Sequence, residues 1–251
     1  MKKLMMLLAK SIRSNDLAAM TAPSSTDGIA IRTVGLTKSY GTSAAPVLAL
    51  RGIDLEVRRG ERVSLLGKSG SGKSTLLNVL GGLDRATSGL VEVGGCDLGR
   101  LGADDLARHR LTTVGMVFQS FNLIASRTLL QNVELPLVFA GLPPEERRAA
   151  ARRILETLGL GRRLAHRPAE LSGGEHQRAA IARALVTHPQ IILADEPTGN
   201  LDSGTADEIV AQLLNHLDAH GTTLVLVTHD EELAERTTRR IVRLRDGRLV
   251  A

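Results

Sequence analysis

A glycine-rich loop near residue 70 constrains this chain more than any other feature of its sequence. It fits the pattern G-x-x-x-x-G-K-[ST]. Its residues are Gly67, Lys68, Ser69, Gly70, Ser71, Gly72, Lys73, Ser74 and Thr75. Glycine lets the backbone wrap so that its N–H groups converge on phosphate oxygens. Lys73 would bring a positive charge to the β- and γ-phosphates, and the Ser74 hydroxyl would bind Mg²⁺. The loop therefore predicts nucleotide binding rather than a simple Gly-Ser-rich turn.

The segments around the loop predict an α/β fold. Val63–Leu66 is expected to be a strand that ends at the loop, and Thr75–Leu80 the helix that follows it. Ile191–Ala194 and Thr223–Val227 are apolar nearly throughout, which is typical of parallel strands covered by helices on both faces. A phosphate loop between a strand and a helix is the arrangement that its chemistry requires.

The rest of the chain completes one domain, expected to span residues 29–251. Ile29–Val34 and Leu48–Val57 alternate like strands with one solvated face, and residues 241–250 predict a hairpin that turns at Asp246–Gly247. Helical patterns dominate residues 100–185, which are expected to form a helical subdomain. Residues 1–28 are expected to be a short tail followed by a polar spacer.

Composition excludes several other classes of protein. The net charge of +5 suggests an anionic partner, but the basic residues are interleaved with acidic ones. One Tyr and three Phe offer no platform for stacking bases, so no nucleic-acid partner is expected. Cys96 is the only cysteine, which excludes an internal disulfide, and it is expected to be a small buried or loop residue. No apolar run approaches the ~20 residues of a membrane-spanning helix, so a membrane role would require a partner.

Two carboxylates follow the apolar strand that ends at Ala194. Asp195 and Glu196 would lie at the carboxyl end of this strand, the edge where α/β sheets bind ligands. In a chain with a phosphate loop, Asp195 is placed to reach Mg²⁺ through water, and Glu196 lies one residue closer to an attacking water. The pair predicts hydrolysis of the bound nucleotide.

A second segment rich in small residues opens a helix in the middle of the chain. Its residues are Ser172, Gly173, Gly174 and Glu175. Small residues at a helix start expose backbone N–H groups, and a serine adds a hydroxyl, so the segment could bind a second phosphate. One reason for a second phosphate site is that each site serves a different nucleotide, shared with a second copy of the chain. The alternative is an ordinary glycine-rich helix start, and the residues alone leave both interpretations open.

The sequence of motifs resembles the ATP-binding-cassette (ABC) family of ATPases. Leu171–Glu175, followed by Gln177–Arg178, resembles the signature motif of that family. The resemblance implies that Tyr40 stacks on the adenine ring. It implies that Gln119 contacts Mg²⁺ and the attacking water, and that His229 contacts the γ-phosphate. Together these motifs cover about residues 29 to 250.

A narrower resemblance is to the subfamily of lipoprotein-release and macrolide-exporter ATPases. The matching segments are Gly82–Asp84, Phe118–Leu123, Asn132–Leu137 and Thr198–Asp202. Within the last segment, residues 199–202 resemble the D-loop of the family only at Leu201 and Asp202. His176 also departs from the family, which usually has Gln there. This change could alter the polarity of a partner interface but is not expected to abolish hydrolysis.

The resemblance implies an α/β fold of the P-loop NTPase class, with a mixed core sheet, an antiparallel β portion and a helical subdomain. It implies ATP hydrolysis with Mg²⁺, for which Ser74, Gln119 and Asp195 are the metal-site candidates. In a homodimer or paired cassette, Lys73 of one copy would face Ser172 of the other across ATP. The expected partner is an integral membrane subunit with an extracytoplasmic domain. This partner would hold the chain at the cytoplasmic face of the inner membrane.

Three alternatives to this interpretation exist. A soluble ABC protein acting on ribosomes or DNA would resemble tandem cassettes or a cassette split by a long coiled coil, and this chain has neither pattern. A P-loop kinase would leave the Ser172 segment and His229 without roles. A cell-division-type regulatory ABC ATPase with the same mechanism remains open within the family.

Overall fold

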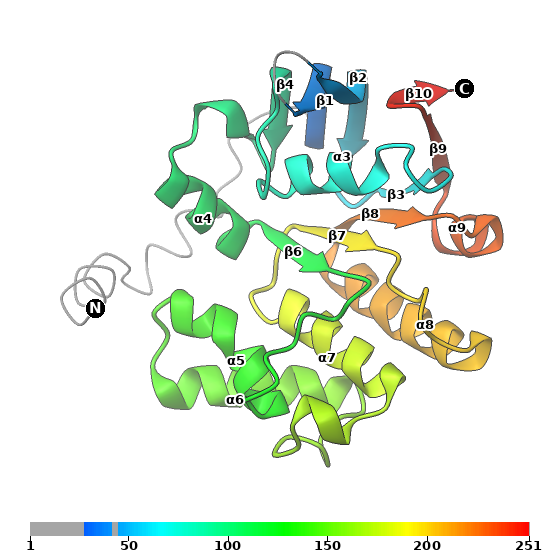
Figure 1. Cartoon of the computed structure of the whole chain (residues 1–251). Coiled ribbons are helices and arrows are strands. Elements are labelled where there is room, and N and C mark those ends of the chain that lie inside the picture. The colour runs from blue at the N-terminus through cyan, green and yellow to red at the C-terminus, as the bar shows by residue number, and fades with distance from the viewer. Residues whose placement is uncertain (1–27, 42–44, 251) are drawn as a thin grey trace.

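In the computed structural model, which describes residues 28–41 and 45–250, the apolar strands lie side by side in one six-stranded sheet (Figure 1). The strand order is β10-β9-β3-β8-β7-β6. The strands are β3 (Arg62–Leu66), β6 (Val114–Val117), β7 (Ile191–Asp195), β8 (Thr223–Thr228), β9 (Arg240–Arg245) and β10 (Arg248–Val250). All neighbours pair in parallel except β9 and β10, which form the predicted antiparallel hairpin. The sheet is therefore mixed, as expected.

The central strands bury both of their faces. On β7, Ile192 and Ala194 face one hydrophobic core, whereas Ile191 and Leu193 face the other. Successive side chains of a strand point to opposite faces, so a strand between two apolar layers must be apolar at every position. This requirement explains why β7 and β8 appear in the sequence as uninterrupted apolar runs.

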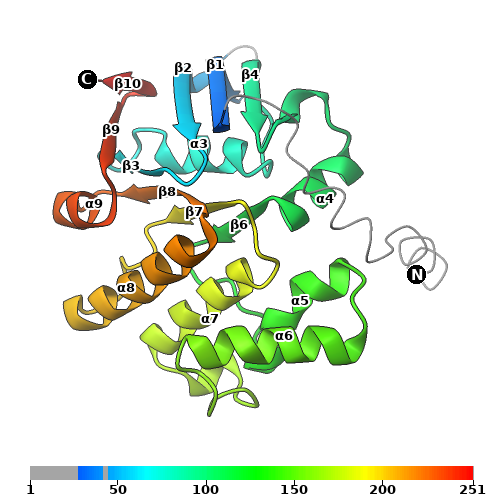
Figure 2. The same ribbon diagram turned by 180° about the vertical axis from the view of Figure 1, so that it is seen from behind.

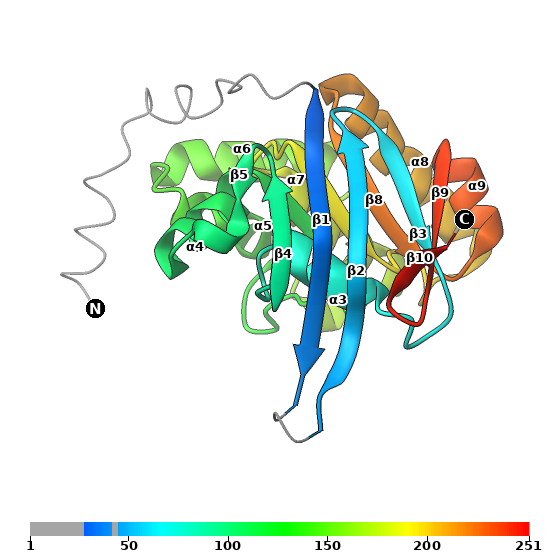
Figure 3. The same ribbon diagram turned by 90° about the horizontal axis from the view of Figure 1, so that it is seen from above.

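A four-stranded antiparallel sheet forms the second layer, in the order β2-β1-β4-β5. Its strands are β1 (Ile29–Tyr40), β2 (Val47–Arg58), β4 (Ser88–Val93) and β5 (Cys96–Asp97). Helix α3 (Lys73–Leu80) lies between the two sheets (Figures 1 and 3) and buries Leu76, Leu77 and Leu80 completely. The expectation that Cys96 is a small buried or loop residue is wrong, because this residue is exposed and lies in a short edge strand.

The remaining helices lie mostly on the other side of the six-stranded sheet (Figures 1 and 2). They are α4 (Ala103–Thr112), α5 (Leu129–Phe139), α6 (Pro144–Thr157), α7 (Gly173–Leu185), α8 (Ser203–His220) and α9 (Glu231–Thr237), with short 3₁₀ turns at Leu98–Arg100 and Pro168–Glu170. Helices α5, α6 and α7 pack together around the core residues Leu129, Leu155 and Ile181.

The stretch of residues 100–185 is not helical throughout, because β6 belongs to the parallel sheet. That α5, α6 and α7 form a subdomain able to move relative to the sheet stays a prediction. Of the expected tail and spacer at residues 1–28, all but Gly28 lie outside the described residues. Within the described part of the chain, no helix has both the length and the apolar character needed to cross a bilayer.

A buried asparagine fixes the loop that joins the sheet to α5. Asn132 is fully buried, and its Oδ1 accepts the N–H of Ile124 at 2.7 Å. Its Nδ2 donates to the carbonyls of Ile124, Arg127 and Thr128. Thr128 also begins α5 through a capping box with Gln131. One buried amide thus contacts four backbone groups, of which the carbonyls of Ile124 and Thr128 also accept backbone N–H groups.

We predict that Asn132→Ala lowers the free energy of unfolding by about 1–3 kcal/mol, because the hydrogen bonds of a fully buried side chain to the loop are lost. The neighbouring Gln131→Ala is the matched control. The Gln131 side chain is exposed and forms only one half of the capping box, so its loss should cost less than about 1 kcal/mol. Urea denaturation followed by circular dichroism compares the two, and equal losses would contradict the buried-network account.

Candidate active site

The phosphate loop connects β3 to α3 and is held tightly against the neighbouring strands. At Gly72 the backbone has φ +105°, and a Cβ there would lie 2.7 Å from the carbonyl oxygen of Ala49. A Cβ at Gly67 would collide with the carbonyl oxygen of Leu244. Both glycines are therefore required for packing, and Gly72 is required for its backbone conformation as well, in addition to any approach of phosphate.

Helix α3 begins with an arrangement suited to an anion. Its N-cap, Gly72, provides no side-chain cap, and its first turn contains no acidic residue. Among the α-helices of the described residues, the others have a side-chain cap or an acidic residue in the first turn. The unpaired N–H groups of α3 therefore have no anion from their own helix.

Lys73 adds a positive charge at the same place. Its side chain is buried, and Nζ donates to two neutral carbonyls, those of Gly67 at 2.6 Å and Lys68 at 3.0 Å. A buried ammonium is usually stabilised by a counter-charge. Amides and a cation that converge here fit a phosphate group.

Asp195 lies beside the start of α3 and is the strongest candidate for a metal ligand. Burial raises the pKa of Asp195, a hydrogen bond with Ser74 opposes this rise, the charge of Glu196 adds to it, and Lys73 lowers it. The structure thus brings Asp195, Ser74 and Lys73 together. A carboxylate next to a hydroxyl offers the oxygen ligands that Mg²⁺ prefers, and a divalent cation would relieve the repulsion between the two carboxylates.

Glu196 and His229 are paired directly. Nδ1 of His229 lies 2.7 Å from Oε1 of Glu196, while the Thr228 hydroxyl is 3.4 Å from Oε2. Glu196 has φ +46°, in the left-handed region that non-glycine residues rarely adopt. Such strain persists only where the surrounding structure holds it, and it often marks functional sites. Here the turn directs the Glu196 carboxylate towards β8 rather than along β7.

Gln119 lies next to the segment that resembles the D-loop. Nδ2 of Asn200 donates to the carbonyl of Gln119 at 3.1 Å. A Cβ at Gly199 would lie 3.3 Å from Nε2 of Gln119 and 3.7 Å from the Cβ of Glu196. These contacts place Gln119 near Glu196, whereas no contact of Gln119 with Asp195 or Ser74 is found among the described residues. They also give Gly199 and Asn200 a local function, although both depart from the family pattern.

The Ser172 segment forms a complete capping box at the start of α7. The Ser172 hydroxyl accepts the N–H of Glu175, and the Glu175 carboxylate accepts the N–H of Ser172 at 2.9 Å. The Ser172 N–H, and then Arg163, lower the pKa of Glu175 against the effect of burial. A Cβ at Gly174 would lie 2.6 Å from Cγ2 of Thr205, so the start of α7 packs directly on α8.

This geometry bears on both interpretations of the segment. Capping and packing account for Ser172, Gly174 and Glu175 without a ligand. Ser172 and Gly173 are nevertheless exposed, so the serine hydroxyl proton and the N–H groups of the first turn remain available to an anion. Both a helix cap and a phosphate contact fit this site.

His176, which departs from the family pattern, contacts the loop that follows Gln119. Its ring stacks on Phe121 with 5.4 Å between centroids and 10° between planes. Arg183 lies two turns further along α7 on the same face, and it donates to the carbonyls of Phe121 and Asn122. Burial lowers the pKa of Arg183. Helix α7 thus holds this loop at two points.

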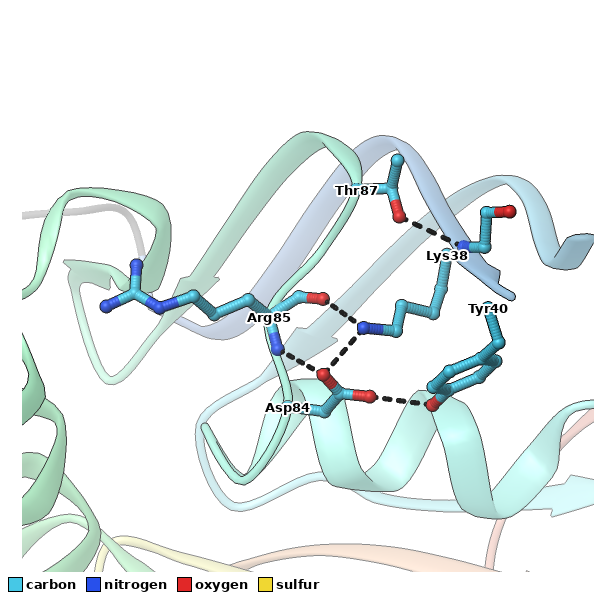
Figure 4. A network of polar contacts seen from close by, with 6 residues as sticks. Lys38, Tyr40, Asp84, Arg85 and Thr87 are labelled. Carbon is cyan, nitrogen blue, oxygen red and sulfur yellow. Dashed lines mark hydrogen bonds and ion pairs between the residues drawn. The ribbon is translucent and has the colours of Figure 1, made fainter. Parts of the chain in front are cut away.

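Tyr40 lies next to α3 (Figure 4), and 42% of the surface of this residue is exposed. Its hydroxyl donates to Oδ2 of Asp84 at 2.7 Å, and Nζ of Lys38 lies 4.7 Å from the ring centroid. Lys38 also bridges Oδ1 of Asp84 and the carbonyl of Arg85. Burial, and then the hydrogen bond to Asp84, raise the pKa of Tyr40, whereas a hydrogen bond with Thr75 lowers it. This network fixes the ring beside the phosphate loop.

The sequence reasoning missed Lys38, Asp84 and Thr228 as parts of the site. Three signals could have indicated them. Lys38 and Tyr40 are two apart in a strand and therefore share a face. Asp84 ends a segment that resembles the subfamily, and Thr228 directly precedes His229.

Comparison with known proteins agrees with this geometry. The family model described as ABC transporter matches residues 50–199. The lipoprotein-releasing system ATP-binding protein LolD of Geobacter metallireducens is 51% identical over 221 residues, which cover 88% of this chain and 98% of that protein. The macrolide export ATP-binding/permease protein MacB 1/2 of Paracoccus denitrificans is 49% identical over 221 residues, 88% of this chain but 33% of that protein. This chain therefore spans about a third of the length of such exporters.

A solved structure supports the fold. The dimeric post-hydrolysis state of the ATP-binding cassette MJ0796 bound to ADP and Pi superposes with a TM-score of 0.82 at 43% identity, over 88% of this chain and 97% of that one. The expected α/β cassette fold is thus confirmed, as is the resemblance to the lipoprotein-release and macrolide-exporter subfamily. With its family match, its relatives and its fold in agreement, this chain belongs to the ABC transporter family and is an ATP-binding-cassette ATPase.

Proposed function

We propose that this ATPase works with Mg²⁺ as one half of a dimer of cassettes that drives an integral membrane partner. The observation that carries this proposal is the convergence of a cationic helix start with two acidic residues. The buried Lys73 and the uncapped start of α3 lie beside Asp195, and Glu196 next in the chain is paired with His229. Such a site can bind phosphate, hold a divalent cation and activate water.

In this mechanism each residue has a separate task. Lys73 and the N–H groups of the loop bind the β- and γ-phosphates, and Tyr40 stacks on adenine with the face that Lys38 leaves open. Ser74 and Asp195 would hold Mg²⁺, joined by Gln119 when its loop moves inward. Mg²⁺ bound there would neutralise the negative charge that develops on the phosphate oxygens.

Glu196 is the proposed general base. Its Oε1 accepts the N–H of His229 at 2.7 Å, whereas its Oε2 has only a long hydrogen bond from the Thr228 hydroxyl, at 3.4 Å. We therefore assign Oε2 as the oxygen that takes the proton of the attacking water. His229 orients this carboxylate and can turn its other ring nitrogen towards the γ-phosphate. Because the Glu196 backbone is held in the left-handed region, the direction of the carboxylate is fixed before ATP binds.

The dimer is proposed from the Ser172 segment. The hydrogen bonds of Ser172 and Glu175 stay within the start of α7 and with Arg163, which leaves an exposed hydroxyl and N–H groups for the nucleotide of a second copy. The MJ0796 cassette, with which this chain superposes, is itself dimeric. ATP would join the two copies, Lys73 of one facing Ser172 of the other.

The membrane partner is proposed from the relatives. In the macrolide exporters the matching segment is a third of an ATP-binding/permease chain, whereas in the LolD protein it is nearly the whole chain. We therefore expect a permease partner with an extracytoplasmic domain, which would hold this ATPase at the cytoplasmic face of the inner membrane.

We expect Lys73→Ala to weaken ATP binding roughly tenfold to a hundredfold, because a charge-assisted contact with phosphate is lost. The matched control is Lys68→Ala, which removes an exposed cation from the same loop but keeps the backbone carbonyl that Lys73 contacts. Titration with ATP measures both affinities. If Lys73→Ala bound ATP as well as the wild type, the phosphate-loop assignment would be wrong.

We expect Glu196→Gln to bind ATP but to hydrolyse it on the order of 10²–10⁴ times more slowly, the usual cost of losing a general base. The variant should then accumulate as a dimer with ATP and Mg²⁺ in size-exclusion chromatography. Adding Ser172→Arg should prevent this dimer, because a bulky side chain would block the γ-phosphate of the partner. A double variant that dimerises as well as Glu196→Gln would remove Ser172 from the nucleotide interface.

We further expect the chain, expressed alone, to remain in the supernatant after ultracentrifugation and to sediment with membranes only when its permease is co-expressed. The reason is that the described helices offer no membrane span. Fractionation followed by immunoblotting checks the distribution. Sedimentation without the permease, abolished by deletion of residues 1–20, would show instead that the N-terminal tail is an anchor.

A further inference from the structure

Three histidines gather at the ends of α7 and α8 that lie away from the Ser172 segment. His216 and His220 belong to the last turns of α8, and His188 lies in the turn that follows α7. Each offers one ring nitrogen, and these three atoms all lie within 4.8 Å of one another. Helices α7 and α8 run side by side beneath the sheet (Figures 1 and 2), which brings these distant parts of the sequence together.

The local backbone explains how the three rings meet. Residues four apart on a helix share a face, so the rings of His216 and His220 stack at 4.2 Å. His188 has φ +52° and donates its N–H to the carbonyl of Leu185, which closes a turn just before Pro189. This turn directs the His188 ring towards that of His220, at 5.6 Å between centroids.

One hydrogen bond also sets the tautomer of His220. Its Nδ1 lies 2.8 Å from the carbonyl oxygen of His216, and because a carbonyl can only accept, Nδ1 carries the proton. The lone pair of His220 is therefore on Nε2. A ring N–H given to a backbone carbonyl is the usual second contact of a metal-binding histidine, since it fixes the orientation of the ring.

The side chains of the cluster define the type of ion that it could bind. Burial lowers the pKa of His216 to about 4, with smaller effects of the charges of His220 and His188. Burial, His220 and Arg153 lower the pKa of His188. The group consists of imidazoles without a carboxylate, which suits zinc-class transition metals and not Mg²⁺ or Ca²⁺.

We propose that His188, His216 and His220 form a binding site for a divalent transition metal of the zinc class, separate from the nucleotide site. Three imidazole ligands leave a fourth position of a tetrahedral ion for water. A cavity of about 250 Å³, lined by His188 and His220 together with Gln190 and Thr222, provides room for it. Ligand nitrogens around Zn²⁺ lie roughly 3.4 Å apart, so small side-chain rotations would complete the site.

Occupancy would connect the turn after α7 to the end of α8. The starts of the same two helices already touch where Gly174 packs on Thr205. A metal at the other ends would therefore hold the pair of helices at both ends and stabilise them against separation. Neither Glu196 nor Lys73 contributes to the site, so ATP hydrolysis does not require it.

The test uses the purified full-length chain after treatment with a chelator. Titration with Co²⁺, followed by visible absorption, and competition with Zn²⁺ should show a tetrahedral site with one ion per chain. Alanine at His188, His216 or His220 should each weaken binding by about tenfold or more, and a large excess of Mg²⁺ should not compete. Zn²⁺ at a hundred times its Kd should raise the Tm of the wild type by several degrees, but not that of the triple variant.

Two matched variants control for other histidines. His166→Ala removes a histidine outside the cluster, and His229→Ala removes the one beside Glu196. Both should keep the Co²⁺ spectrum and its stoichiometry. Circular dichroism and ATP hydrolysis confirm that the cluster variants are folded. The proposal is overturned if the wild type binds no Co²⁺, if His188→Ala binds as well as the wild type, or if the His166 or His229 variant loses the ion.

Discussion

The parallel pairing of β3, β8 and β7 is the constraint on which the rest of the molecule depends. Parallel strands end at the same edge, so the residues after these three strands must lie close together. The phosphate loop follows β3, Glu196 follows β7 and His229 follows β8. Residues more than a hundred positions apart in the chain thereby meet without any direct connection between them, and α3 between the two sheets supplies the helix start at the same edge.

Much of this arrangement could be predicted because it depends on local patterns. The apolar runs of β7 and β8 indicate strands buried on both faces, and the order strand, glycine-rich loop, helix identifies the phosphate loop. From these two facts the juxtaposition of Lys73, Asp195 and Glu196 follows, since it needs only that the strands are parallel. The antiparallel hairpin at the end of the chain was equally accessible, because Asp246–Gly247 is a strong turn signal.

Side-chain contacts between different elements could not be predicted in this way. No periodicity in the sequence indicates that the Asn132 side chain would form hydrogen bonds with the backbone around Ile124, or that the His176 ring would stack on Phe121. The pairing of Asp84 with Lys38 and Tyr40 likewise depends on how the antiparallel sheet sits on α3. Strand β6 was missed because four residues between two helices are too few to show a clear pattern. Each of these features belongs to tertiary packing, which local propensity does not encode.

The absence of a side chain at Gly174 has a mechanical consequence. Because the α7 backbone there rests directly on the methyl group of Thr205, no side chain of α7 lies between the two helix starts to absorb a displacement. Glu175 stiffens one side of this contact through its capping box, and Asp202 stiffens the other by capping α8. The starts of α7 and α8 are therefore capped and packed directly against each other. In the proposed dimer, a displacement of one of these helix starts by a nucleotide would also displace the other, because the two are in direct contact.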